Sequence, residues 1–294
     1  MQVLTGKEVA EHVYARLEAD CREFVHEHGY APTLAVVLVG SDPASQSDVA
    51  VKNQAVLSVG YGHRDYQLPE HTSEEALLAL VHSLNIDPLV HGILVQLPLP
   101  SHMSEERVIQ AIAVEKDVDG FHPQSVGNLL IGHPGFVSCT PQGVMEMIDY
   151  YQIETAGKHV VILGRSNIVG KPMASLLIQK GRDATITICH SKTQNLTELT
   201  RQADILIAAI GKPLFVTKDM IKEGCIIIDV GINRVQDASR KRGYRLVGDV
   251  DYEHVAPLCK AITPVPGGVG VMTIAILMKN TMQAAVQLAS EETV

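Results

Sequence analysis

The stretch HVVILGRSNIVGKPMASLL, residues 159–177, decides the fold of this chain. An unbroken apolar run comes first, a turn bounded by Gly164 and Gly170 follows, and Pro172 stands near the start of a segment of helical composition. A continuous apolar strand is typical of a parallel sheet that helices cover on both faces, and proline is well tolerated in the first turn of a helix. The stretch therefore predicts a strand, a turn and a helix of an α/β unit.

The same alternation of strands and helices extends to both sides of this stretch. Strands are expected at residues 34–39, 65–68, 92–97, 159–163, 184–189, 205–210 and 225–230. Helices are expected at residues 5–29, 43–60, 73–84, 170–180, 196–202 and 273–288, and a further helix begins at Thr140. Repeated alternation of this kind indicates an α/β protein built on a doubly wound parallel sheet.

The length of the chain sets the number of domains. Its 294 residues are enough for roughly two domains of ordinary size. We place the boundary near Thr140, so that the first domain covers residues 1–138 and the second covers residues 139–272. Because the amphipathic segment at 273–288 follows the last strand, we expect residues 273–294 to pack back on the first domain and complete it.

Charge and hydropathy argue against several classes of partner. Lys and Arg number 24 and Asp and Glu number 33, so the formal net charge of −9 argues against binding to nucleic acid or to an anionic membrane. The apolar stretches are far shorter than the roughly 18 residues that span a bilayer. The first residues, MQVLTGKEVAEHV, lack the apolar core of a secretory signal. We therefore expect a soluble, cytoplasmic protein.

Cysteines and histidines give no sign of a metal site. The five cysteines are widely spaced with no CxxC pair, which favours reduced thiols that serve as packing residues. The thirteen histidines show no HxxxH or HExxH spacing. We expect no bound metal.

The turn at residues 164–170 is a candidate nucleotide site. Glycines in a strand-to-helix turn let a phosphate approach backbone N–H groups at the helix N-terminus, where the helix dipole favours negative charge. The turn departs from a strict GxGxxG because Ser166 replaces the middle glycine. A plain packing turn is the alternative. Three residues of the turn, Gly164, Arg165 and Ser166, are the candidate contacts.

The end of the next strand favours NADP over NAD. An NAD-binding unit usually places an Asp or Glu there for the ribose 2′-hydroxyl, whereas this chain has His190, Ser191 and Lys192. Together with Arg165 these residues suit the 2′-phosphate of NADP, because a carboxylate would repel it and an Arg binds it. A solvated polar loop is the alternative. Gly211, Gly231 and the segment PVPGGVG (264–270) also follow strand ends, where ligands bind in open α/β sheets.

Three polar residues of the first half of the chain follow apolar strands or lie just before the second half. Each can be functional, and each also has an ordinary structural interpretation. Lys52 belongs to a helix after the first strand and can be an ordinary solvated lysine. Gln96, followed by Pro98, can be a polar residue at a sheet end, and Asp119 can be a loop cap. A lysine desolvated in a cleft can instead act as a general acid or base near neutral pH.

The chain resembles the methylenetetrahydrofolate dehydrogenase/cyclohydrolase family over nearly its whole length. The motifs that carry the resemblance are GILVQLPLP (92–100), KDVDGFHP (116–123), CTPQG (139–143), GRSNIVGKP (164–172), CHSKT (189–193), VGIN (230–233) and ITPVPGGVG (262–270). The resemblance implies a cytoplasmic homodimer of one-carbon metabolism, which serves purine biosynthesis. It implies oxidation of 5,10-methylenetetrahydrofolate with NADP and hydrolysis of the methenyl product to 10-formyltetrahydrofolate. Residues 1–138 would be the folate-binding catalytic domain, and residues 139–272 a Rossmann-like NADP-binding domain.

The resemblance also implies roles for individual residues. The catalytic positions are Lys52, Gln96, which orients the lysine, and Asp119, which holds the pterin ring. The substrate-binding positions are Ser45, Asp48, Val95, Pro98, Pro266, Gly267 and Gly268. The cofactor-binding positions are Gly164, Arg165, Ser166, Ser191, Gly211, Gly231, Ile232 and Thr273.

Two positions depart from the family pattern. Asp48 stands where the family has a tyrosine that stacks on the folate, and Val271 stands where it has a proline. Loss of the ring predicts weaker folate binding. On a helix, Asp48 and Lys52 lie one turn apart, so we expect an ion pair that favours the charged amine and impairs hydrolysis more than oxidation.

Two alternative functions follow from the sequence. The first is a nucleotide-binding or regulatory protein of the same family with impaired cyclohydrolase activity or lost folate chemistry, and Asp48 is its only support. The second is another two-domain dehydrogenase, acting on amino acids or shikimate-like acids, which leaves VQLPLP and PVPGGVG unexplained.

Overall fold

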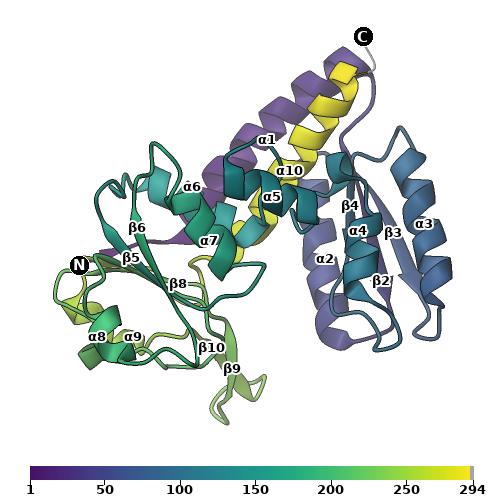
Figure 1. The fold of residues 1–294 in the computed structure, drawn as a ribbon. Coiled ribbons are helices and arrows are strands. Elements are labelled where there is room, and N and C mark those ends of the chain that lie inside the picture. Colours follow the sequence, from purple (N-terminus) through teal and green to yellow (C-terminus); the bar gives the residue numbers. More distant parts are fainter. Residues whose placement is uncertain (292–294) are drawn as a thin grey trace. The chain divides into compact units, whose positions relative to one another are not determined.

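Residues 1–291 are described by the structure, a computed structural model, and they form two compact units. The six-stranded unit comprises Met1–Ala10, Leu129–His133 and Ser138–Thr273. The three-stranded unit comprises Glu11–Asn128, Pro134–Val137 and the chain from Ile274 onward. Figure 1 follows the chain through both units, and each is described here by itself.

The six-stranded unit is built on a parallel sheet with the strand order β1-β11-β8-β7-β5-β6. Its strands are β1 (Gln2–Val3), β5 (His159–Leu163), β6 (Thr185–Cys189), β7 (Ile205–Ala208), β8 (Ile226–Asp229) and β11 (Ala261–Ile262). The central strands are buried on both faces: every residue of β7 and the last four of β5 are at most 2% exposed. This burial explains why their sequences are continuous apolar runs.

Helices cover both faces of this sheet. They are α6 (Cys139–Tyr150), α7 (Gly170–Leu177), α8 (Leu196–Thr200) and α9 (Tyr252–Val255), with the 3-10 turns η2 (Lys218–Met220) and η3 (Ala256–Leu258). An antiparallel hairpin of β9 (Asn233–Gln236) and β10 (Tyr244–Val247) projects from the unit (Figure 1). The doubly wound parallel sheet predicted from the sequence is confirmed.

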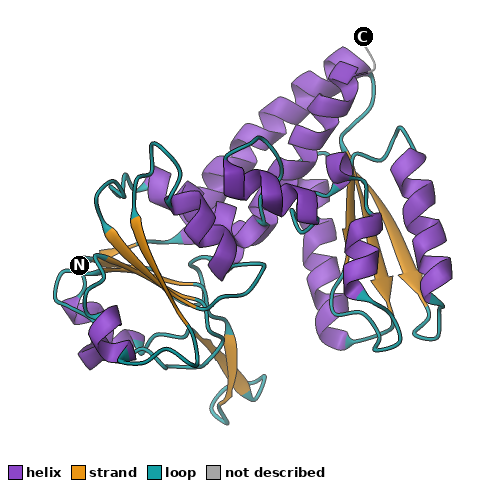
Figure 2. Cartoon of the chain, in the orientation of Figure 1, coloured by secondary structure: helices purple, strands orange, loops and turns teal. Residues whose placement is uncertain are grey.

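The three-stranded unit contains a parallel sheet in the order β3-β2-β4, flanked by helices (Figure 2). The strands are β2 (Thr33–Val39), β3 (Gly62–Leu68) and β4 (Gly92–Val95). The helices are α1 (Gly6–His28), α2 (Pro43–Ser58), α3 (Glu74–Ile86), α4 (Glu105–Ala111), α5 (Pro123–Ile131) and α10 (Gly270–Glu291), with the 3-10 turn η1 (Val114–Lys116). Ends of α1, α5 and α10 belong to the six-stranded unit.

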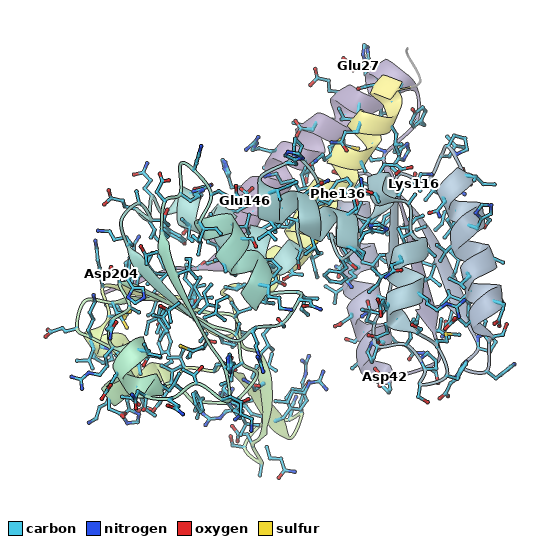
Figure 3. The ribbon with its side chains drawn as sticks, in the orientation of Figure 1. Glu27, Asp42, Lys116, Phe136, Glu146 and Asp204 are labelled. Atoms are coloured by element: carbon cyan, nitrogen blue, oxygen red, sulfur yellow. The ribbon has the colours of Figure 1, made fainter. Side chains whose placement is uncertain are left out.

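Side chains of the expected type start several of these helices. Asp42, labelled in Figure 3 at the start of α2, accepts a hydrogen bond from the Ser45 N–H at 2.8 Å. Ser73 and Ser104 cap α3 and α4 in the same way. Such caps satisfy N–H groups that have no partner within the helix, so the local sequence sets where each helix begins.

The last helix completes the three-stranded unit, as predicted. From Ile274 onward α10 belongs to that unit. The Tyr61 hydroxyl donates a hydrogen bond to the Met278 carbonyl oxygen at 3.2 Å, and the Asn280 side-chain amide donates to the Val118 carbonyl oxygen at 2.8 Å. Helix α10 thereby holds two segments that are distant in sequence.

Several elements differ from the sequence prediction. Helix α6 begins at Cys139 with Ser138 as its N-cap residue, so Pro141 lies in its first turn and Thr140 is not the cap. The β9–β10 hairpin, the two-residue strands β1 and β11, and helices α4, α5 and α9 were not predicted. The two-residue strands and the four-residue helix α9 carry too few residues to show a period of 2 or 3.6.

The five cysteines are buried and form no disulfide within residues 1–291, which agrees with the prediction of reduced packing residues. Among residues 1–291 there is no helix long and apolar enough to cross a membrane. No group of three or more His, Cys, Asp or Glu side chains that could hold a metal ion occurs in that part of the chain.

A buried histidine makes the stability of the three-stranded unit dependent on pH. His91, just before β4, is 1% exposed; its Nδ1 accepts a hydrogen bond from the Thr33 N–H at 3.0 Å, and its ring stacks on Tyr30. Burial lowers the pKa of His91 from 6.5 to about 4, and the charge of Lys116 adds to this effect. The native state therefore holds a neutral imidazole in mildly acidic solution.

We expect the free energy of unfolding to fall as the pH drops from 6.5 through about 4. In that window the unfolded chain binds a proton at His91 and the native chain does not, which costs on the order of 2–3 kcal/mol at pH 4.5. His91→Gln should remove this part of the acid dependence in urea denaturation at pH 7 and pH 4.5. His82→Gln, at an exposed position on α3, is the control. Equal pH dependence in the wild type and His91→Gln would contradict the prediction.

Candidate functional site

The Lys52 amine and the Gln96 side chain meet at the ends of two neighbouring strands. Lys52 lies on α2, which follows β2, and Gln96 directly follows β4. The Lys52 Nζ donates a hydrogen bond to the Gln96 Oε1 at 2.8 Å. The Gln96 Nε2 donates to the Leu97 carbonyl oxygen at 2.9 Å, which turns the amide oxygen toward the lysine. The structure therefore contains a Lys52–Gln96 hydrogen bond, and the catalytic roles of the two residues stay predictions.

The loop that follows α4 is held by two buried charged residues. The Lys116 amine, labelled in Figure 3, donates to the carbonyl oxygens of Leu84 and Asp87, which lie at the C-terminal end of α3. The Asp117 carboxylate accepts hydrogen bonds from the N–H groups of Phe121 and His122. Asp117 therefore serves as a loop cap in this motif.

Asp119 has the properties of a functional carboxyl group. Burial raises the pKa of Asp119 to about 6, the positive charge of Lys52 opposes this rise, and the negative charge of Asp117 adds to it. A carboxyl group with a pKa near neutrality can exchange a proton with a bound molecule, or accept a hydrogen bond from it, at physiological pH. The structure thus couples Asp119 and Lys52 electrostatically.

The other candidate substrate residues of the three-stranded unit differ in accessibility. Ser45 and Val95 are buried, and the Ser45 hydroxyl donates to Asp42 at 3.0 Å as part of the α2 cap. Asp48 and Pro98 are exposed. The expected ion pair between Asp48 and Lys52 is not formed among the described residues, and the lysine amine bonds to Gln96. The prediction of that ion pair is wrong.

The turn between β5 and α7 leaves little room for side chains. Gly164 has a φ of +122°, and a Cβ at this position would lie 2.1 Å from the Ala209 carbonyl oxygen. The Ser166 hydroxyl accepts hydrogen bonds from the N–H groups of Val169 at 3.1 Å and Gly170 at 3.4 Å. N–H groups of this kind were predicted to face a phosphate, but these two are bonded within the turn.

A cavity of about 510 Å³ opens where β5, β6 and β7 end. It is lined by Leu163, Gly164, Arg165, Ser166, Cys189, His190, Ser191, Thr193, Leu196, Ala209, Ile210, Lys212 and Phe215. The Lys212 ammonium stands 5.5 Å from the centre of the Phe215 ring. The cavity brings together Arg165 and Ser191, the two candidates for the 2′-phosphate, and adds the cation of Lys212. Polar and cationic groups at this place suit an anionic dinucleotide.

The remaining candidates gather in loops of the same unit. Pro266, Gly267 and Gly268 line a second cavity of about 110 Å³ together with Gly231 and Ile232. The exposed Val271, the departure from the family pattern, lines it too. The loop at 266–268, predicted to bind the substrate, thus lines the same cavity as two residues predicted to bind the cofactor.

Two further cofactor candidates take part in hydrogen bonds. The Thr273 hydroxyl lies 2.9 Å from the Thr140 hydroxyl oxygen, within hydrogen-bond distance. The Gly211 N–H donates to the buried carboxylate of Asp249 at 3.0 Å. Hydrogen bonds therefore fix these two positions within the six-stranded unit.

Sequence reasoning missed three polar residues of this unit. Lys212 directly follows the named Gly211, so its place after a strand could have indicated it. Asp229 ends β8, and Asp249 lies just after β10. The position of Asp229 at a strand end could have indicated it in the same way, whereas Asp249 carried no such signal, because its contact with Ile210 spans about 40 residues of the chain.

The fold and these cavities define a class of protein: an α/β dinucleotide-binding protein with a second α/β unit that carries a lysine, a glutamine and an aspartate. A family model described as tetrahydrofolate dehydrogenase/cyclohydrolase, catalytic domain, matches residues 4–119. A second, described as tetrahydrofolate dehydrogenase/cyclohydrolase, NAD(P)-binding domain, matches residues 138–289. The chain belongs to the tetrahydrofolate dehydrogenase/cyclohydrolase family, and the resemblance drawn from the motifs is confirmed.

Individual relatives agree with this assignment over nearly the whole chain. The bifunctional protein FolD of Chlorobium phaeobacteroides is 53% identical over 288 residues, which are 97% of this chain and 98% of that protein. The crystal structure of FolD from Campylobacter jejuni, 45% identical, has a TM-score of 0.93 and covers 98% of this chain and 99% of its own. The Trypanosoma brucei FolD, described as complexed with NADP cofactor and inhibitor, is 37% identical with a TM-score of 0.91 over 97% of both chains.

The crowding at Gly164 gives a prediction for nucleotide binding. Gly164→Ala should weaken NADP binding by about tenfold or more, because the added Cβ has to displace the Ala209 carbonyl and the backbone φ of +122° is unfavourable for alanine. Titration calorimetry measures the effect. Gly157→Ala, at a positive φ in the same unit with open space around it, is the matched control. Equal NADP affinities of the two variants would contradict the prediction.

Proposed function

We propose that this protein oxidises 5,10-methylenetetrahydrofolate with NADP and hydrolyses the methenyl product to 10-formyltetrahydrofolate. The observation that carries the proposal is the Lys52–Gln96 hydrogen bond of 2.8 Å beside a carboxyl group whose pKa is raised to about 6. Family membership supplies the reaction, and this geometry supplies groups able to perform it. The protein is thus proposed as a bifunctional enzyme.

The hydrolysis step requires proton transfer at a fixed place. Water attacks the methenyl carbon of the cationic substrate, and one C–N bond breaks. Of the two protons of the water, one reaches the released nitrogen and the other leaves to the solvent, which removes the positive charge. Lys52 is half-buried and held by Gln96, so its amine is positioned to exchange one of these protons. Asp119 is proposed to bind the pterin ring, because a partly buried carboxyl group accepts hydrogen bonds from ring N–H groups.

The oxidation step requires positioning more than proton transfer. When bound, NADP supplies the acceptor for the hydride that leaves the methylene carbon. Arg165, Ser191 and Lys212 are proposed to hold its 2′-phosphate, and the cavity that they line has room for this end of a dinucleotide. Gly231, Ile232 and Thr273 are proposed to line the nicotinamide region, and Gly164, Ser166 and Gly211 to complete the cofactor site.

The proposal extends to the organisation and partners of the protein. Residues 1–138 with 273–294 would bind folate through Ser45, Asp48, Val95 and Pro98, and residues 139–272 would bind NADP, with Pro266, Gly267 and Gly268 contacting the folate. A tetrahydrofolate derivative is the proposed substrate. We still expect a cytoplasmic homodimer that binds neither nucleic acid nor membranes. The net charge of −9 supports the expectation that nucleic acid and anionic membranes are not partners.

The regulatory alternative rested on Asp48 alone, which would remove the stacking ring and would hold the Lys52 amine in an ion pair. The contacts of Lys52 do not support the second of these effects. Asp48 is exposed, and the Lys52 amine bonds to Gln96. These contacts favour an active enzyme in which the surface that binds folate carries an aspartate in place of the family's tyrosine.

The two half-reactions can be tested separately on purified protein. We expect 5,10-methylenetetrahydrofolate and NADP to give the methenyl absorbance band and then its decay, with NAD much less effective. Lys52→Met should slow the decay of added methenyltetrahydrofolate by about 100-fold or more, since the proton carrier is gone. Gln54→Met, exposed on the same helix, is the control. A protein that acts on neither folate, or a Lys52→Met variant with full hydrolysis, would contradict the proposal.

Introducing a tyrosine at position 48 tests whether the absence of the family's aromatic ring weakens folate binding. Asp48→Tyr should strengthen folate binding by about tenfold, because base stacking on an aromatic ring is worth about 1–3 kcal/mol in related cases. Hydrolysis at limiting folate should rise with it. Ala50→Tyr, exposed on a different face of α2, is the control. An unchanged KM for folate in Asp48→Tyr would show that the missing ring does not limit binding.

A further inference from the structure

Two carboxylates are buried at the carboxyl edge of the six-stranded sheet. Asp229 is the last residue of β8 and is 3% exposed, and Asp249 follows β10 and is 0% exposed. Neither forms an ion pair within residues 1–291, although a buried carboxylate is costly unless it is paired or hydrogen-bonded. Hydrogen bonds to the two carboxylates therefore have to offset the cost of burying them.

Asp229 organises the strand ends around it. Its Oδ1 accepts hydrogen bonds from the N–H groups of Gly231 and Asp249, both at 3.0 Å. Its Oδ2 accepts one from the Val250 N–H at 3.0 Å. Asp229 thereby joins the loop after β8 to the segment after β10, and it fixes the backbone that carries Asp249.

Asp249 extends the same network to the loop after β7. Its Oδ2 accepts hydrogen bonds from the N–H groups of Ile210 at 2.8 Å and Gly211 at 3.0 Å. Its Oδ1 accepts one from the Asn233 side-chain amide at 2.9 Å. Two carboxylates therefore connect the ends of three chain segments: residues 210–211, 231–233 and 248–250.

Two glycines allow the close approach that the network requires. A Cβ on Gly248 would lie 1.8 Å from the Asp229 Oδ2, and a Cβ on Gly231 would lie 2.2 Å from the Asp249 Oδ1. Burial raises the pKa of Asp229 to about 7, and the negative charge of Asp249 adds to the rise, whereas the backbone N–H donors oppose it. The local chain is thus shaped around the two acids.

We propose that Asp229 and Asp249 are positioning residues for NADP binding, which they support by fixing the loops at 210–211 and 231–233. The inference rests on the proposed function. Ile210 lines the large cavity at the ends of β5, β6 and β7, and Gly231 and Ile232 line the smaller cavity beside residues 264–271. The acids need not touch the cofactor, because the backbone that they hold forms parts of both cavities.

Truncating Asp249 tests the proposal. Asp249→Ala removes the acceptor of the Ile210 and Gly211 N–H groups, so the NADP dissociation constant from titration calorimetry should rise by about tenfold or more. Asp249→Asn keeps one oxygen for these donors and should recover most of the affinity. The ratio of NADP-dependent oxidation to hydrolysis should fall in Asp249→Ala, because hydrolysis consumes water and no hydride acceptor.

An aspartate at the opposite edge of the same sheet provides the matched control. Asp204, labelled in Figure 3, directly precedes β7 and accepts a hydrogen bond from the His159 N–H at 2.8 Å, at the start of β5. Asp204→Ala should lower the stability of the fold and leave the NADP dissociation constant within about twofold of the wild type. A merely structural role of Asp249 would make the two variants alike.

Three results would overturn the inference. They are a folded Asp249→Ala variant with wild-type NADP affinity, an equal loss of affinity in Asp204→Ala, and an unchanged ratio of the two activities. Should Asp249→Ala not fold, Asn233→Ser decides the question: it removes only one donor to Asp249 and should weaken NADP binding by about threefold, and no change contradicts the inference. A wild-type protein that binds no NADP would instead refute the proposed function itself.

Discussion

The contact between Lys52 and Gln96 depends on the parallel pairing of β2 with β4. Val37 of β2 is paired with Val95 of β4, and the Gln96 N–H donates to the Val37 carbonyl oxygen at 2.8 Å. Parallel strands end at the same edge of a sheet, so the residues that follow them meet there even when 44 positions separate them in the chain. An antiparallel partner in the place of β4 would have put Gln96 at the far end of the sheet, away from α2. The contact between Lys52 and Gln96 is thus a consequence of strand direction.

Buried carboxylates hold a polar network in each of the two units. Asp117 accepts backbone N–H groups in the three-stranded unit, as Asp229 and Asp249 do in the six-stranded unit. Strand ends leave N–H groups that water cannot reach, and a carboxylate with two oxygens can accept several of them at once. A loop whose N–H groups are bonded to such a carboxylate is more rigid than a loop whose N–H groups are bonded to water. Asp117 differs in this respect from Asp119 of the same motif: Asp117 is buried, whereas Asp119 is only half-buried.

Local sequence patterns predicted the elements that are long and strongly apolar. The strand at 159–163 was predicted with its observed bounds, and the starts of α2 and α7 were predicted at Pro43 and Gly170. Helix α7 ends three residues earlier than predicted, at Leu177, since residues 178–180 keep a helical composition but lie in the following turn. Strands β1 and β11 form only because they pair with each other and with β8. Two residues have no periodicity of their own, so these strands could not be predicted.

The site was predicted mainly through family motifs, and the structure corrects the physical argument at one point. Helical spacing placed Asp48 one turn before Lys52 and so predicted an ion pair. That rule describes two side chains with no other partner, but β4 brings a third group, the Gln96 amide oxygen, to the lysine amine. An exposed ion pair contributes only about 0.2–0.5 kcal/mol, less than a hydrogen bond from a charged donor inside the fold. The structure contains the tertiary contact and lacks the helical one, so the spacing of two residues on one helix was not enough to predict the partner of Lys52.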